Sequence, residues 1–112
     1  MRRVLVRALE RSYRVIEAAN GREGVDAVRE HQPDVVITDM LMPHKEGIET
    51  IREIQDLAPW TKIIAMSGGG RSRNFMFLDV ARAFGADAVL TKPFPLAALM
   101  DAVDRLVGAP PH

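Results

Sequence analysis

The fold is decided by the stretch Pro33-Asp34-Val35-Val36-Ile37-Thr38-Asp39-Met40-Leu41-Met42-Pro43. Its aliphatic run, Val35 to Ile37, is too short for a buried helix and is bounded by prolines, which predicts a strand buried on both faces. In open α/β sheets, ligands and chemistry sit outside the carboxyl ends of the strands. Asp39 follows the run and is therefore the first candidate for a functional side chain. A lone aspartate after a strand more often caps a turn, so other motifs in the sequence are needed to assign a functional role to Asp39.

The composition excludes several classes of protein. A chain of 112 residues is one domain and buries roughly two-thirds of its unfolded surface. Because 15 basic and 15 acidic residues balance, we expect no direct binding to nucleic acid. Cysteine is absent, which removes disulfides, thiolate metal sites and cysteine nucleophiles. We see no apolar run long enough for a membrane span or a signal peptide, and so predict a cytoplasmic protein without membrane partners.

Apolar periodicity predicts strands that alternate with helices. Short apolar runs predict strands at 13–16, 35–37, 62–66 and 88–90, and helical spacing predicts helices at 2–11, 21–31, 47–58, 75–84 and 96–107. A strand at 4–6 is an alternative to the first helix, but a parallel crossover needs about a dozen residues and far fewer separate it from the next run. The alternation predicts a doubly wound parallel sheet with helices on both faces.

Polar side chains follow three of the predicted strands. They are Asp39, Ser67, and Lys92 within Thr91-Lys92-Pro93-Phe94. Since parallel strands end at one edge of a sheet, we expect a carboxylate, a hydroxyl and an ammonium to converge. This set suits phosphoryl transfer to a carboxylate: Asp39 attacks phosphorus, Lys92 neutralises phosphoryl oxygens, and the Ser67 hydroxyl donates a hydrogen bond to one of them.

With these motifs, the chain resembles the receiver domain of bacterial two-component response regulators. The resemblance rests on the PDVVITD-x-x-MP stretch followed by Gly47, on the small hydroxyl residue after the next strand, and on the Lys-Pro-Phe motif. It covers about residues 1–107 and leaves 108–112 as a flexible tail. It implies a flavodoxin-like (CheY-like) parallel sheet of order 2-1-3-4-5, incomplete here at the N-terminus.

The resemblance also implies roles for individual residues. Asp39 would be the phosphoacceptor, Ser67 and Lys92 would contact the phosphoryl group, and the backbone carbonyl of Leu41 would be a Mg²⁺ ligand. The family's first strand and the acidic pair that holds the metal are missing from this sequence. Mg²⁺ takes near-octahedral oxygen ligands with one or two carboxylates, so we expect metal binding and phosphorylation to be weak or absent.

A second departure concerns the switch that follows phosphorylation. Val89 stands where the family often carries an aromatic residue that moves inward on activation. The conformational change that follows phosphorylation would then have to involve Ser67 and the glycines at 68–70. Val89 itself is interpreted as a core residue.

The missing strand would leave a gap in the centre of the sheet. Burying about five aliphatic side chains at roughly 1.5–3 kcal/mol each is comparable with a net stability of about 5–15 kcal/mol. Strands 13–16 and 35–37 could close up, or two chains could form a homodimer with exchanged or abutting edges, which we favour. A third alternative is that Met1 is an internal methionine of a longer receiver.

The function expected from this resemblance is signalling without an output domain and without enzymatic turnover. Asp39 would accept a phosphoryl group from a histidine kinase or phosphotransfer protein, and protein contacts would carry the signal. The family's usual output face corresponds here to 74–84, 88–90 and 95–107. The alternative is a phosphorylation-independent pseudo-receiver that serves as an interaction or dimerisation module.

Other candidate sites are weaker. His31 and His44 have no spaced partner ligand, so both are interpreted as solvated. Arg71 and Arg73 follow three glycines but lack the lysine and hydroxyl of a Walker A loop. A hydrolase built on Ser67 would lack a histidine placed as its base.

Overall fold

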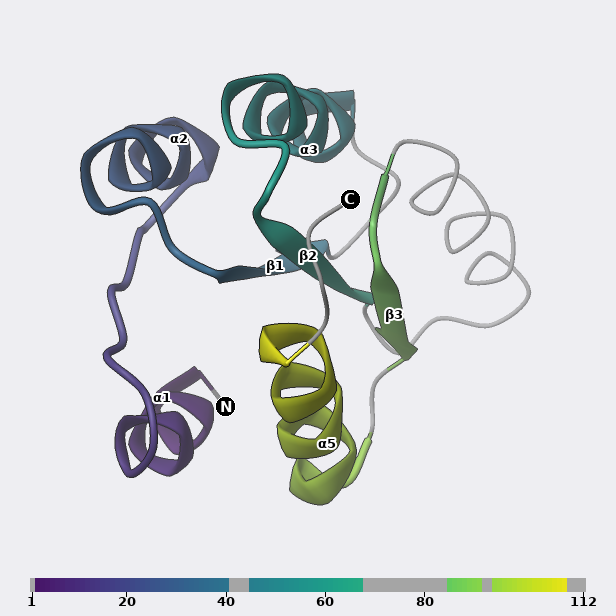
Figure 1. Cartoon of the computed structure of the whole chain (residues 1–112). Helices are drawn as coiled ribbons and strands as arrows, with labels where there is room; N and C mark the ends of the chain where they lie inside the picture. Colours follow the sequence, from purple (N-terminus) through teal and green to yellow (C-terminus); the bar gives the residue numbers. More distant parts are fainter. Residues whose placement is uncertain (1, 41–44, 68–84, 92–93, 109–112) are drawn as a thin grey trace.

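The computed structural model describes residues 2–40, 45–67, 85–91 and 94–108, and these form a parallel sheet between two layers of helices. The sheet has the order β1-β2-β3, with β1 at Val35–Met40, β2 at Lys62–Ser67 and β3 at Ala88–Thr91. The helices are α1 (Arg2–Glu10), α2 (Gly21–His31), α3 (Lys45–Leu57) and α5 (Leu96–Val107). Figure 1 shows α2 and α3 on one face of the sheet and α1 and α5 on the other. The predicted doubly wound, CheY-like fold is confirmed.

Strand β2 forms the centre of the core, because its side chains alternate between two apolar clusters. Ile63 and Ala65 belong to the upper cluster, with residues of α2 and α3: Val25, Val28, Ile51 and Ile54. Ile64 and Met66 belong to the lower cluster, with residues of α1 and α5: Leu5, Leu9, Leu99, Ala102 and Val103. Each helix layer therefore packs on one face of the same strand.

Local signals explain where α2 begins and ends. The Asn20 side chain accepts a hydrogen bond from the Glu23 amide at 2.9 Å, and Glu23 Oε1 accepts one from the Ala19 amide at 3.3 Å. Together these bonds form a reciprocal cap of the kind that satisfies free amides at a helix start. At the other end, Gln32 adopts a left-handed conformation with φ 49°. The helix predicted at 21–31 is thus confirmed.

The predicted helices at 2–11, 47–58 and 96–107 agree with the structure to within two residues at each end. Residues 2–10 are helical, which excludes the alternative strand at 4–6. Helix α3 begins at Lys45, two residues before the expected start at Gly47. The helix predicted at 75–84, the glycine loop, Arg71, Arg73, His44 and the tail at 109–112 lie outside the described residues.

The predicted strand at 13–16 is wrong. Residues 14–18 belong to no helix or strand, and Figure 1 places this connection farther out than β1. A strand exists only when a neighbour takes up its hydrogen bonds, and in the described part of the chain no strand stands between this segment and β1. The two segments therefore do not close up against each other.

The expectation that β1 is buried on both faces also needs correction. Val36 packs against the upper cluster, and Val35 and Ile37 pack against the lower one. All three side chains nevertheless remain half-buried. The reason is that β1 is the terminal strand of the described sheet, so water reaches it along one edge.

None of the described helices combines the length and apolar character that crossing a bilayer requires.

Candidate functional site

The carboxyl ends of the three strands lie at one edge of the sheet. The register pairs Met40 with Ser67, and Ser67 with Thr91, so each strand ends at the same level. Asp39 precedes Met40 in β1, and Ser67 is the last residue of β2. The structure thus brings the backbone positions of Asp39 and Ser67 onto adjacent strands, as the sequence predicted.

The remaining predicted site residues fall outside the described part of the chain. Lys92 directly follows Thr91, the last residue of β3, and Leu41 directly follows Met40. Thr91 is exposed at the strand end. The described part of the site therefore consists of the carboxyl ends of the three parallel strands, which lie side by side.

Hydrogen bonds at the amino ends of the strands set this register. The Lys62 amide donates to the Asp34 carbonyl at 2.9 Å, and the Thr61 hydroxyl donates to the Pro33 carbonyl at 2.8 Å. On the other side of β2, the Asp87 amide donates to the Ile63 carbonyl at 2.7 Å, while an Asp87 carboxylate oxygen accepts from the Ile63 amide at 2.8 Å. These bonds fix the register of all three strands. β1 and β2 have six residues each, and β3, with four, begins opposite Ile64, so all three strands end at the same level.

The same bonds reveal which way the backbone groups of β1 face. In a parallel ladder, the amide and carbonyl of one residue point to one side, and those of the next residue point to the other. Because the Asp34 carbonyl binds β2, the backbone groups of Val36, Thr38 and Met40 also face β2. Those of Val35, Ile37 and Asp39 face the opposite, open edge.

The described residues do not by themselves form a Mg²⁺ site, and the predicted ligand Leu41 lies outside them. No group of three or more histidine, cysteine, aspartate or glutamate residues among them could hold a metal ion. His31 ends α2, and its Nε2 lies 3.8 Å from a carboxylate oxygen of Glu30, a surface contact.

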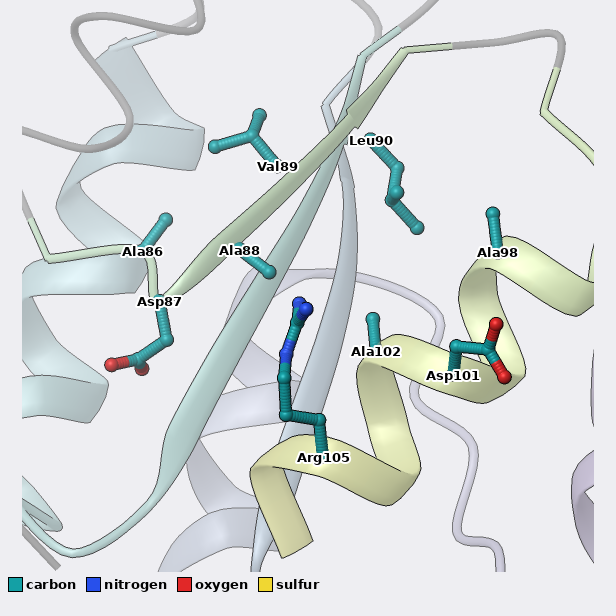
Figure 2. Close-up of a pocket in the computed structure, with 9 residues that line it drawn as sticks. All are labelled: Ala86, Asp87, Ala88, Val89, Leu90, Ala98, Asp101, Ala102 and Arg105. Carbon is teal, nitrogen blue, oxygen red and sulfur yellow. The ribbon is translucent and has the colours of Figure 1, made fainter. Parts of the chain in front are cut away.

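A groove of about 410 Å³ runs between β3 and α5 (Figure 2). Its floor is formed by small and aliphatic residues, and it carries three charged residues: Asp87, Asp101 and Arg105. Figure 2 shows Arg105 reaching from α5 toward β3. Val89 lines the groove and also packs, half-buried, against the upper cluster. Sequence reasoning did not single out the charged residues, although Asp101 and Arg105 have the spacing of neighbours on a helix face.

Similarity to known proteins agrees with this geometry. The family model described as the response regulator receiver domain matches residues 1–104. The chain is 34% identical over 110 residues to the chemotaxis protein CheY of Halobacterium salinarum, covering 97% of this chain and 89% of that protein.

Two solved structures have the same fold. The receiver domain of NtrX from Brucella abortus superimposes with a TM-score of 0.84 at 20% identity, covering 97% of this chain and 91% of that one. A response regulator from Burkholderia pseudomallei, solved with a phosphorylated aspartic acid, calcium ion and citrate, gives a TM-score of 0.76 at 26% identity, covering 90% of this chain and 58% of that one.

The sheet order, the common level of the strand ends and the family match over nearly the whole chain support one assignment. The chain belongs to the response regulator receiver domain family, the CheY-like signalling modules of two-component systems.

Proposed function

We propose that this receiver domain accepts a phosphoryl group on Asp39. The observation that carries the proposal is the register of the strand ends, which brings Asp39 of β1 beside Met66 and Ser67 of β2, with β3 ending at the same level. The related Burkholderia pseudomallei regulator carries a phosphorylated aspartic acid, which supports the same chemistry here.

The proposed step is a substitution at phosphorus. A carboxylate oxygen of Asp39 attacks the phosphorus of a phosphohistidine on a histidine kinase or phosphotransfer protein. The new O–P bond forms as the P–N bond breaks, and the departing imidazole takes a proton from water. Lys92 neutralises the charge on the phosphoryl oxygens, and the Ser67 hydroxyl donates a hydrogen bond to one of them. The product is an acyl phosphate, and the domain acts as a switch rather than a turnover enzyme.

The groove between β3 and α5 is the proposed output surface. It belongs to the face on which the resemblance to receivers places partner contacts, and its apolar floor with charged residues suits a protein partner. β3 ends at the level of Ser67, so a change at the phosphorylation site has a short route to this groove through the backbone of β3.

The test is phosphorylation by phosphoramidate, a small donor with a P–N bond, followed by intact-mass measurement. We expect one phosphoryl group on the wild-type chain and none on Asp39→Asn. Asp34→Asn is the matched control, because Asp34 directly precedes β1, at the opposite end of the strand from Asp39. Uptake that survives Asp39→Asn would contradict the proposal.

Amide NMR with Mg²⁺ and beryllofluoride, an acyl-phosphate mimic, gives a second measurement. We expect saturable shifts at Asp39 and Ser67. Trp60 is a poor reporter, because it is 45% exposed and lies in the turn before the amino end of β2, at the opposite end of that strand from Ser67. A folded chain that neither takes up phosphate nor responds to the mimic would support the pseudo-receiver alternative.

A further inference from the structure

A second groove, of about 410 Å³, lies between α2 and α3. Figure 1 shows these two helices side by side on one face of the sheet, with α5 on the other face. Val25 lines the groove and is buried, whereas the charged residues that line it are exposed. The groove therefore has an apolar floor and two charged walls, one on each helix.

The two walls carry opposite net charges. Helix α2 contributes two arginines and one aspartate, a net charge of +1, and α3 contributes two glutamates, a net charge of −2. The residues are Arg22, Asp26 and Arg29 on α2, and Glu49 and Glu53 on α3. Their spacings of three, four and seven residues place the charges of each wall along one side of its helix.

The two walls do not neutralise each other. Arg29 lies 3.4 Å from Asp26 of its own helix, and the two side chains are 64% and 65% exposed. Exposed pairs of this kind contribute little to stability, so Arg29 can exchange this partner for another. Within the described ranges, no ion pair joins Arg22 or Arg29 to Glu53.

A close contact at one end of the groove sets the two helices level with each other. A Cβ on Gly21 would collide with the hydroxyl of Thr50, so the start of α2 touches α3 at this point. Helices α2 and α3 lead into the parallel strands β1 and β2, and they therefore run in the same direction. The arginines, which follow Gly21, and the glutamates, which flank Thr50, thus lie at similar heights along the groove.

We propose that this face binds a second copy of the chain and forms a symmetric dimer. A twofold axis that runs along the groove lays α2 of each protomer over α3 of the other. The basic wall of one protomer then meets the acidic wall of its partner, and the symmetry repeats this contact. An axis across the groove would instead lay each wall over its own copy, where like charges repel.

A second copy is the occupant because this face is complementary to itself. One surface supplies both the basic and the acidic wall, so the twofold axis satisfies both with no other protein. The chain has 15 basic and 15 acidic residues, so two copies approach without net repulsion. Exposed charges contribute only modest attraction, which makes the dimer weak and sensitive to salt.

This contact differs from the dimer of exchanged or abutting sheet edges that the sequence suggested. It uses the outer side of two helices, and no edge of the sheet takes part. It also involves neither Asp39 nor the strand ends, so it goes beyond the proposed function.

Two double variants of the full chain test the proposal. Arg22→Glu with Arg29→Glu gives both walls a negative charge, and Glu49→Arg with Glu53→Arg gives both walls a positive charge. Each variant alone should be a monomer, because its dimer would bring like charges together. An equimolar mixture should form a heterodimer at least as tight as the wild-type dimer, because an acidic face then meets a basic one.

Association is measured by analytical ultracentrifugation at protein concentrations up to about 1 mM, which detects weak dimers. The wild-type chain should dimerise at low salt, and about 0.5 M NaCl should abolish the dimer. Amide NMR shifts on dilution should fall on α2 and α3. The matched control is Arg7→Glu with Arg11→Glu, which makes the same change in net charge at α1, and it should dimerise like the wild type.

Four results would overturn the proposal. They are a wild-type chain that stays monomeric, a dimer that survives in either variant alone, a mixture that does not associate, and an equal loss of association in the control. Circular dichroism verifies that each variant is folded, and the salt dependence and dilution shifts of the wild type need no variant. Since none of these measurements involves phosphate, the dimer can fail while Asp39 is still phosphorylated.

Discussion

At the residue scale, Gly85 is the position where the backbone most clearly requires glycine. Its φ is +111°, and a Cβ there would lie 2.0 Å from the Gln55 side chain, which hydrogen-bonds to the Gly85 carbonyl. We predict that Gly85→Ala lowers the free energy of unfolding by about 1–2 kcal/mol or more, from the left-handed backbone alone. Urea denaturation followed by circular dichroism measures it.

Gly24 provides the matched control for this prediction. It lies inside α2, and an added Cβ would come no closer than 4.0 Å to Ala18. Gly24→Ala should raise the free energy of unfolding by about 0.5–1 kcal/mol, because alanine favours the helix. Equal effects of the two substitutions would refute the backbone explanation for Gly85.

Tyr13 connects the end of α1 to α5 through one hydrogen bond. Its hydroxyl donates to the Asp104 carboxylate, and this bond, with partial desolvation and the nearby negative charge, raises the pKa of Tyr13 above its usual 10.0. A raised pKa in the folded state stabilises the protein below about pH 10, and that contribution is lost as pH rises through the folded-state pKa.

The prediction is that Asp104→Asn lowers the pKa of Tyr13 toward its usual value. Tyr13 is the only tyrosine in the chain, so the ultraviolet absorbance of tyrosinate reports it alone. Asp101→Asn, on the same helix, should leave the pKa of Tyr13 unchanged. An unchanged titration of Asp104→Asn would exclude the hydrogen bond as the cause.

At the scale of a single element, β1 should show alternating protection. The amides of Val36, Thr38 and Met40 face β2, whereas those of Val35, Ile37 and Asp39 face the open edge. We predict slow hydrogen exchange for the first set and fast exchange for the second, because among the described residues only the first set has ladder partners. NMR of the protein transferred to deuterated water measures both. Uniform protection along β1 would show that its edge is covered in solution.

At the scale of the whole molecule, stability depends on both helix layers packing on β2. Leu99 of α5 is fully buried in the lower cluster, whereas Leu96 of the same helix is 38% exposed. We predict that Leu99→Ala lowers the free energy of unfolding by about 2–5 kcal/mol, a large part of a domain's net stability.

The control for this prediction is Leu96→Ala. It makes the same chemical change at an exposed position, and it should alter the free energy of unfolding by about 0.5 kcal/mol or less. Comparable losses in the two variants, measured by urea denaturation, would mean that α5 does not pack through Leu99.

Much of the fold could be predicted from local pattern. Helical spacing of Leu99 and Val103, and the cap at Asn20, identified α5 and the start of α2 because these signals lie within one or two helical turns. The positions of Asp39 and Ser67 at adjacent strand ends followed from the parallel topology. Their roles with Lys92 stay predictions.

What the sequence by itself determined is therefore the described helices α1, α2, α3 and α5, the strands β1 to β3, and the parallel order that places Asp39 and Ser67 at one edge of the sheet. Only the tertiary structure showed that residues 13–16 form no strand, that β1 is half-buried, and that a groove lies between β3 and α5. The apolar pattern at 13–16 was compatible with a strand, but a strand forms only where another strand pairs with it. The groove likewise depends on residues such as Asp87 and Arg105, which are distant in sequence and come together only through packing.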